Sequence, residues 1–174
     1  MSPSIIETEL FEIYFSKDKS GKEDRKFKPK EKELILKSIK SAEETISKVI
    51  SFSRSKPVGE IYRVPIIFEK ISKKRFQEKH QNHFAMIDYP PIGMKWNMTL
   101  KCTGIEIKSQ TAVISLCPLT NKDFIETIVH EVIHAFYDSF TTINGANIKN
   151  NTYFIEGLTE WLTQLTMTTS FSSS

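Results

Sequence analysis

The sequence lacks any long apolar run. No window of about 20 consecutive apolar residues occurs in the 174-residue chain, which excludes a membrane-spanning helix. Its first residues, MSPSIIETELFEIYF, have neither the basic n-region nor the apolar h-region of a secretory signal peptide. We therefore expect a chain that is made and kept in the cytoplasm, or that is exported by a route without a cleaved signal peptide.

Cysteine is also scarce. Cys102 and Cys117 are the only two cysteines, too few for a framework of disulfides, and this number fits a reducing compartment. We expect both to be small buried hydrophobic side chains rather than a disulfide pair.

Neither sign of charge dominates the chain, whose formal net charge is +3. Residues 1–80 carry 19 basic and 13 acidic groups, a balance of +6, whereas residues 81–174 carry 5 and 8, a balance of −3. Lysine is mixed with glutamate in the basic half, which is typical of a solvated helix face, so nucleic acid is disfavoured as a partner. The length predicts a single domain over residues 1–174, with residues 1–30 and 167–174 at its periphery.

Apolar residues in the first half recur at helical spacing. They stand at intervals of 4, 3, 4 and 3 residues: Ile35, Ile39, Ala42, Ile46 and Val49. This pattern predicts an amphipathic helix that packs behind a sheet.

Strand patterns fill the middle of the chain. Residues 61–69 are rich in β-branched and aromatic types, although Pro65 predicts an edge or irregular position for this strand. Apolar residues alternate with polar ones over 96–107, and residues 111–119 form a further apolar run that ends near Pro118. Together these patterns predict a small, mostly antiparallel sheet.

Two further helices are expected in the second half. The segment KDFIETIVHEVIHAFYDSF, residues 122–140, has a broad apolar face and predicts a buried helix. A last helix covers YFIEGLTEWLTQL, residues 153–165, and the Ser/Thr-rich tail after it is expected to fray. Helices and strands in this order predict an α+β fold.

The buried helix contains the sequence HEVIH. His130 and His134 are four residues apart, so both imidazoles lie on one helix face and can bind one metal ion. Glu131, next to the first histidine, can accept a proton from a metal-bound water without binding the metal itself. Imidazole nitrogen suits zinc, which we predict at one ion per chain. The alternative is a pair of core histidines satisfied by hydrogen bonds.

HEVIH, followed about twenty residues later by Glu-Gly-Leu-Thr-Glu on a helix, resembles the gluzincin class of zinc metallopeptidases over roughly residues 105–165. The resemblance implies a zincin-like fold, in which a small sheet with a backing helix is joined by the HExxH helix and a following glutamate-bearing helix. It implies that Glu156 is the third metal ligand and that Glu160 supports the first histidine. It also implies that residues 111–116, TAVISL, form a cleft-edge strand that binds substrate; otherwise they are an ordinary sheet edge.

Large members of this class stabilise the reaction's oxyanion with a histidine or tyrosine. Tyr153 is the first choice for that role in this chain, with a core or loop aromatic as its alternative, and Tyr137 is the second. Asp138 is a weaker candidate than Glu156 for the third ligand, because a residue so close on the same helix is badly placed to close a tetrahedral site. His80 and His83 are expected to be exposed rather than to bind metal.

The sequence thus predicts a zinc-dependent metallopeptidase that acts on a protein or peptide substrate. The small size and the missing signal peptide favour one kind of metallopeptidase, a bacterial effector or toxin-like protease. A non-catalytic, zinc-stabilised domain that binds a protein is the main alternative, and a basic nucleic-acid-binding module is the third. Glu131 distinguishes the peptidase from the non-catalytic domain, because a structural zinc site gains nothing from a glutamate base.

Overall fold

A computed structural model of the chain describes residues 5–16, 26–53, 63–71, 74, 85–89, 95–98, 101–106, 111–117, 121–143 and 152–171. The helices are α1 (Pro29–Ser53), α3 (Asn121–Ile143) and α4 (Thr152–Ser170). The main sheet contains β1 (Ile5–Glu7), β2 (Phe11–Phe15), β3 (Val64–Lys70), β7 (Ala112–Leu116) and β4 (Ala85–Asp88), in that order, while β5 (Lys95–Met98) pairs with β6 (Lys101–Glu106). The predicted α+β class is confirmed.

The main sheet is mixed, not mostly antiparallel as the sequence predicted. The three inner strands β2, β3 and β7 run parallel, and the outer strands β1 and β4 pair antiparallel with their neighbours. The parallel pair β2 and β3 is joined through α1, the helical crossover that parallel strands need. Strands β3 and β7 are buried along almost their whole length, as inner parallel strands are, whereas β2 is buried at alternate positions. The direction of pairing depends on distant segments of the chain, which the spacing of residues within one strand does not report.

Two strands predicted at a sheet edge lie inside the sheet. Residues 111–116 belong almost entirely to β7, which pairs with β3 on one side and β4 on the other, so the edge position next to them is taken by β4. Pro65 also lies in an inner strand. Val64 donates its N–H to Leu10 O on the β2 side, so the missing N–H of Pro65 faces the β7 side, where pairing begins only at Ile66.

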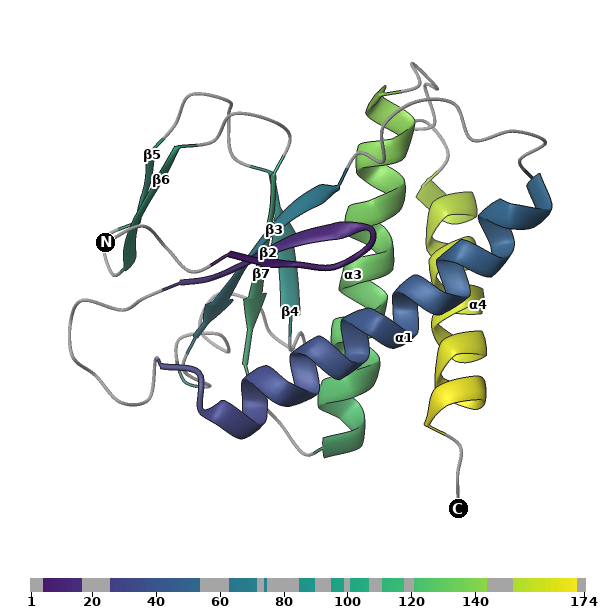
Figure 1. The fold of residues 1–174 in the computed structure, drawn as a ribbon, viewed down its shortest axis with the longest axis horizontal. Helices are drawn as coiled ribbons and strands as arrows, with labels where there is room; N and C mark the ends of the chain where they lie inside the picture. Colours follow the sequence, from purple (N-terminus) through teal and green to yellow (C-terminus); the bar gives the residue numbers. More distant parts are fainter. Residues whose placement is uncertain are drawn as a thin grey trace.

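The hydrophobic core lies between one face of the sheet and the helices. Figure 1 shows α1, α3 and α4 grouped beside the main sheet, with the β5–β6 pair on the other side of it. Alternate residues of the inner strands point towards the helices and are buried in one cluster with them: Phe11, Ile13, Ile66, Phe68, Ile114 and Leu116. The opposite face carries a smaller apolar cluster of Tyr14, Ile67 and Val113, which are neighbours in the strand register.

The predicted apolar face of α1 is confirmed, because Ile35, Ile39, Ala42 and Ile46 are fully buried. Strands β1 and β2 are part of the main sheet, and β2 carries the fully buried core residues Phe11 and Ile13. Cys117 is buried, as predicted for a small hydrophobic side chain, and the side chain of Cys102 lies outside the described residues. No helix in the described part of the chain is both long and apolar enough to cross a lipid bilayer.

The Ser/Thr-rich end of the chain is helical rather than frayed as far as Ser170. The hydroxyls of Thr163 and Thr166 donate hydrogen bonds to carbonyls four residues earlier, at 2.7 and 2.8 Å. Thr166 Oγ1 also lies 2.8 Å from Thr45 Oγ1 of α1, and Met167 is buried in the core. Satisfied hydroxyls and tertiary packing thus outweigh the low helix propensity of threonine.

The start of α1 is fixed by an ion pair between Glu31 and a buried lysine, Lys70. Pro29 occupies the first turn, and Glu31 accepts the backbone N–H of Lys28 at 2.7 Å, as a capping glutamate does. The same carboxylate binds the buried ammonium group of Lys70, at the end of β3, at 2.9 and 3.0 Å. Lys70 also donates to the carbonyl of Lys26. One carboxylate therefore caps the helix and neutralises a buried charge.

We predict that Glu31→Ala lowers the free energy of unfolding by about 3 kcal/mol, because it leaves the buried Lys70 charge without its partner. Glu33→Ala, which removes an exposed carboxylate from the same turn region, is the control and should change it by less than about 0.5 kcal/mol. Urea unfolding of the three proteins measures both values. Equal stabilities of the two variants would contradict the assigned role of Glu31.

Candidate metal centre

Helix α3 positions His130, Glu131 and His134. The helix forms because apolar residues on its broad inner face pack into the core, among them Ile128, Val129, Val132 and Ile133, all fully buried. His130 is partly exposed and His134 is nearly buried, so both histidines lie where the buried face of α3 meets its surface. The two rings are neighbours, with their centroids 4.8 Å apart.

Helix α4 runs back beside α3 and brings two glutamates to the histidines (Figure 1). Leu162 and Thr159 face inwards and are fully buried, which fixes the rotation of α4 about its axis. Glu156 and Glu160 lie one turn apart and are about half exposed. Their shared side of α4 therefore faces the histidine side of α3.

The histidines and Glu156 form a group that could hold a metal ion. Glu156 Oε1 lies 3.1 Å from His134 Nε2, and Glu156 Oε2 lies 3.8 Å from His130 Nε2. One ligand atom from each of the three residues lies within 4.8 Å of the others. Ligand atoms around a tetrahedral ion with bonds of about 2.0 to 2.1 Å lie roughly 3.3 Å apart, so these side chains would have to draw closer together around an ion; imidazole nitrogen and carboxylate oxygen are both donors that bind metal ions.

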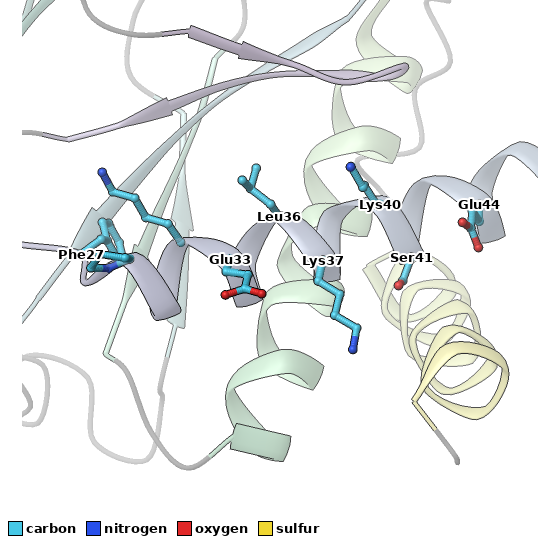
Figure 2. A pocket seen from close by; sticks show the side chains of 9 residues that line it. Phe27, Glu33, Leu36, Lys37, Lys40, Ser41 and Glu44 are labelled. Atoms are coloured by element: carbon cyan, nitrogen blue, oxygen red, sulfur yellow. The ribbon is translucent and has the colours of Figure 1, made fainter.

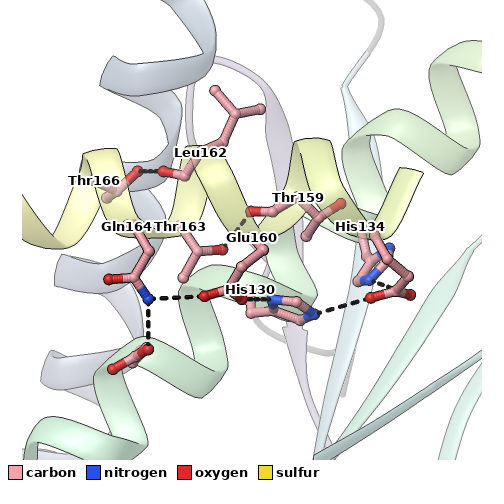
Figure 3. A network of polar contacts seen from close by, with 10 residues as sticks. His130, His134, Thr159, Glu160, Leu162, Thr163, Gln164 and Thr166 are labelled. Carbon is pink, nitrogen blue, oxygen red and sulfur yellow. Dashed lines mark hydrogen bonds and ion pairs between the residues drawn. The ribbon is translucent and has the colours of Figure 1, made fainter. Parts of the chain in front are cut away.

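The other nitrogen of His130 faces Glu160. Glu160 Oε2 lies 3.5 Å from His130 Nδ1, which leaves Nε2 of the same ring towards Glu156 (Figure 3). Gln164 donates one N–H to Glu160 Oε1 and the other to Glu126 Oε1 of α3, both at 2.9 Å. One amide group thus joins two carboxylates that would otherwise repel each other, and holds Glu160 beside the histidine. Carboxylates placed in this way orient metal-binding histidines.

Burial shapes the charge states at the centre. It lowers the pKa of His130 below its usual 6.5, with a further decrease from His134, so the ring is neutral and able to bind metal at pH 7. Burial also raises the pKa of Glu131 to about 7, against the opposing effect of His134, and the carboxylates of Glu156 and Asp138 add to the rise. Glu131 is therefore close enough to the donor group to respond to its charges.

The sequence predicted three metal ligands and one carboxylate that supports them, and the structure brings all four residues together. His130, His134 and Glu156 form the donor group, and Glu160 lies on its α4 side. Tyr153 is the second residue of α4, and its side chain lies outside the described residues. His80 and His83 also lie outside them.

Two weaker candidates have other contacts. Tyr137 packs edge-on against the ring of Phe136 in the core, with ring centroids 5.4 Å apart. Asp138 is not in the metal group and accepts a hydrogen bond of 2.5 Å from the hydroxyl of Tyr89. The low ranking of Asp138 as a ligand agrees with this geometry.

Sequence reasoning missed Tyr89 and Gln164. Tyr89 directly follows β4, and its bond to Asp138 fastens the end of this outer strand to α3 one turn beyond His134. The sequence shows Tyr89 only as part of a turn before Pro90, so nothing connected it to α3. The contact of Gln164 with Glu160 could have been predicted from the sequence, because the two residues are four apart and so lie on the same helix face.

A separate depression of about 920 Å³ lies along α1 and is lined by residues such as Phe27, Leu36, Lys37 and Lys40 (Figure 2). Its lining contains neither histidine nor any residue of α3 or α4. The depression is therefore not part of the metal centre.

Comparisons of the chain with protein-family models, with curated proteins and with solved structures find no match. The geometry of the chain's own residues is thus the basis for assigning a function.

We predict that zinc binding releases a proton from Glu131. With a pKa of about 7, the carboxyl group is partly protonated at pH 7 in the metal-free protein, and a nearby cation lowers that pKa. Wild type should therefore release more protons per zinc than Glu131→Gln at pH 7, and the difference should shrink as the pH rises above the pKa. Calorimetry in buffers of different ionisation enthalpy measures the difference. Equal release by both proteins at pH 7 would contradict the raised pKa.

Proposed function

We propose that the chain is a zinc-dependent metallopeptidase that hydrolyses peptide bonds of a protein substrate. The observation that carries this proposal is the three-donor group of His130, His134 and Glu156 with Glu131 next to it. Within the described residues the group has no fourth protein donor. Three protein ligands and an open position are typical of catalytic zinc sites, whereas structural sites have four protein ligands.

The metal would supply one part of the chemistry. Zinc held by the three donors would lower the pKa of water there towards about 7 and would polarise the carbonyl group of the substrate. The chain's own residues do the rest. Glu131 accepts the proton of the attacking water and then gives it to the leaving nitrogen, as a general base followed by a general acid.

Glu160 and Gln164 act on the centre through His130. A carboxylate at Nδ1 keeps that nitrogen protonated, so Nε2 presents its lone pair to the metal. Gln164 holds the carboxylate in this position from the same helix. Tyr153, three residues before Glu156, stays the proposed donor of a hydrogen bond to the oxyanion.

A second candidate function is a non-catalytic, zinc-stabilised domain that binds a protein. The exposed aromatic side chains of Phe154 and Trp161 on α4 favour a protein partner in either case. Glu131 favours the enzyme, because a structural site has no use for a base beside its ligand.

We expect Glu131→Gln to keep zinc and lose catalysis. Both it and wild type should bind about one zinc per chain, since the glutamine leaves all three donors in place, and cleavage of a mixed protein substrate should fall about 10²- to 10⁴-fold in the variant. The measurements are metal content by mass spectrometry and cleavage by gel electrophoresis, with and without a chelator.

Glu44→Gln is the control, because it removes an exposed carboxylate of α1 that lines the separate depression. It should cleave as wild type does. Equal cleavage by Glu131→Gln and wild type, or cleavage that persists after the chelator has removed the metal, would contradict the proposed mechanism.

A further inference from the structure

The buried side chains of α4 lie in its second part. Among the described residues of the helix, they begin at Thr159 and end at Met167. Leu162 and Met167 belong to the main core, and the hydroxyl of Thr166 contacts that of Thr45 on α1. The helix from Thr159 onwards is therefore anchored by packing that does not involve the metal centre.

The first six residues of α4, Thr152–Gly157, are more loosely held. None of the described side chains in this segment is buried. Phe154 is 58% exposed, and Glu156 is about half exposed. Glu156 connects the segment to α3 through His134, at 3.1 Å, and His130, at 3.8 Å. The segment Thr152–Gly157 is called the α4 arm below.

The sequence of the α4 arm makes its helix weak. Gly157 lies inside the helix, where glycine is less stable than alanine, and a Cβ atom there would meet no heavy atom within 4 Å. Packing therefore does not require glycine at this position. The first turn has no acidic side chain to offset the helix dipole. Glu156 and Glu160 are four residues apart, and like charges at this spacing destabilise a helix.

These features together allow the α4 arm to open while the rest of the protein stays folded. Helical segments with few buried contacts open locally at a lower free energy than the core does. A metal ion at the centre would oppose this opening, because it would join Glu156 of the arm to two histidines of α3 and offset the charge of the carboxylates. A ligand that binds only the docked conformation stabilises that conformation.

We propose that the α4 arm docks stably on α3 only when metal binds, and that Gly157 is the hinge at which the arm opens when the centre is empty. His130 and His134 are fixed on α3, so they bind the ion first and Glu156 then completes the donor group. The structure shows the docked conformation, which the ion selects. The inference needs metal binding but not peptide hydrolysis, so it goes beyond the proposed function.

Docking of the arm has one consequence that does rest on the proposed function. Tyr153, the proposed donor to the oxyanion, belongs to the α4 arm. The third metal ligand and this donor would therefore reach the centre in the same step. A chain without metal would lack both.

Amide hydrogen exchange of the full-length protein, with and without zinc, tests the inference. Each helical N–H bonds to the carbonyl four residues earlier, so opening of the arm frees the N–H groups of residues 156–161 and leaves those of residues 163–167 bonded. In the metal-free protein the first set should exchange at least about tenfold faster than the second, and zinc should remove most of this difference. Equal exchange of the two sets without metal would overturn the inference, and so would a difference that zinc leaves unchanged.

Gly157→Ala strengthens the helix of the arm without touching a donor. It should raise the zinc affinity about three- to fivefold, because a larger share of the metal-free protein then has its arm docked. Thr169→Ala is the matched control, since it also puts alanine in place of a poor helix former on α4, at an exposed position beyond the anchored part. It should change the affinity less than about twofold. Titration against a chromophoric chelator measures the affinities, and equal values for all three proteins would overturn the role of Gly157.

Glu156→Ala removes the donor that connects the arm to the metal and keeps a good helix former. Its two histidines should still bind zinc, at least about tenfold more weakly than wild type, and saturating zinc should leave residues 156–161 in fast exchange. Slow exchange in this zinc-bound variant would overturn docking through Glu156. Loss of all zinc binding would overturn the order in which the donors bind.

Peptide cleavage by the same samples separates this inference from the proposed function. If wild type cleaves peptides but zinc does not slow exchange in the α4 arm, the inference fails and the proposed function stands. If zinc docks the arm but wild type cleaves nothing, the proposed function fails and the inference stands. If wild type binds no zinc, both fail.

Discussion

The contact between α3 and α4 is the constraint on which the candidate site depends. The histidines are positioned by their own helix, but Glu156 reaches them only because α4 packs beside α3 with one fixed rotation. Buried Leu162 and Thr166 set that rotation, and the bond from Thr166 to Thr45 ties α4 to α1 as well. Thr159, Thr163 and Thr166 are all buried on the inner face of α4, and the hydroxyls of Thr163 and Thr166 donate to carbonyls of the same helix.

Negatively charged side chains gather at the centre. The carboxylates of Glu126, Glu156 and Glu160 gather around two imidazoles, and the described residues nearby supply one neutral amide, that of Gln164, between two of them. His130 is neutral at pH 7 because burial lowers its pKa. A divalent ion held by His130, His134 and Glu156 would offset this negative charge, which is the physical reason to expect metal rather than a simple hydrogen-bonded histidine pair.

The sequence was informative wherever a local pattern was enough. The spacing of Ile35, Ile39 and their successors predicted the buried face of α1, and HEVIH with a later Glu156 predicted three residues that the fold places together. It failed where the answer depended on distant partners. The direction and order of the strands, the inner position of Pro65, and the pairs formed by Tyr89 with Asp138 and by Lys70 with Glu31 all join segments that are far apart in the chain. The spacing of apolar and polar residues along the sequence does not predict such contacts.

The central claim is that the two histidines and Glu156 hold zinc and leave one position open. A crystal structure of the zinc-loaded protein, with the ion located by anomalous scattering at the zinc edge, tests it most directly. We predict one zinc bound by His130 Nε2, His134 Nε2 and a Glu156 oxygen, with a non-protein oxygen as the fourth ligand. Zinc at another site, or a fourth protein side chain that closes this one, would contradict the claim.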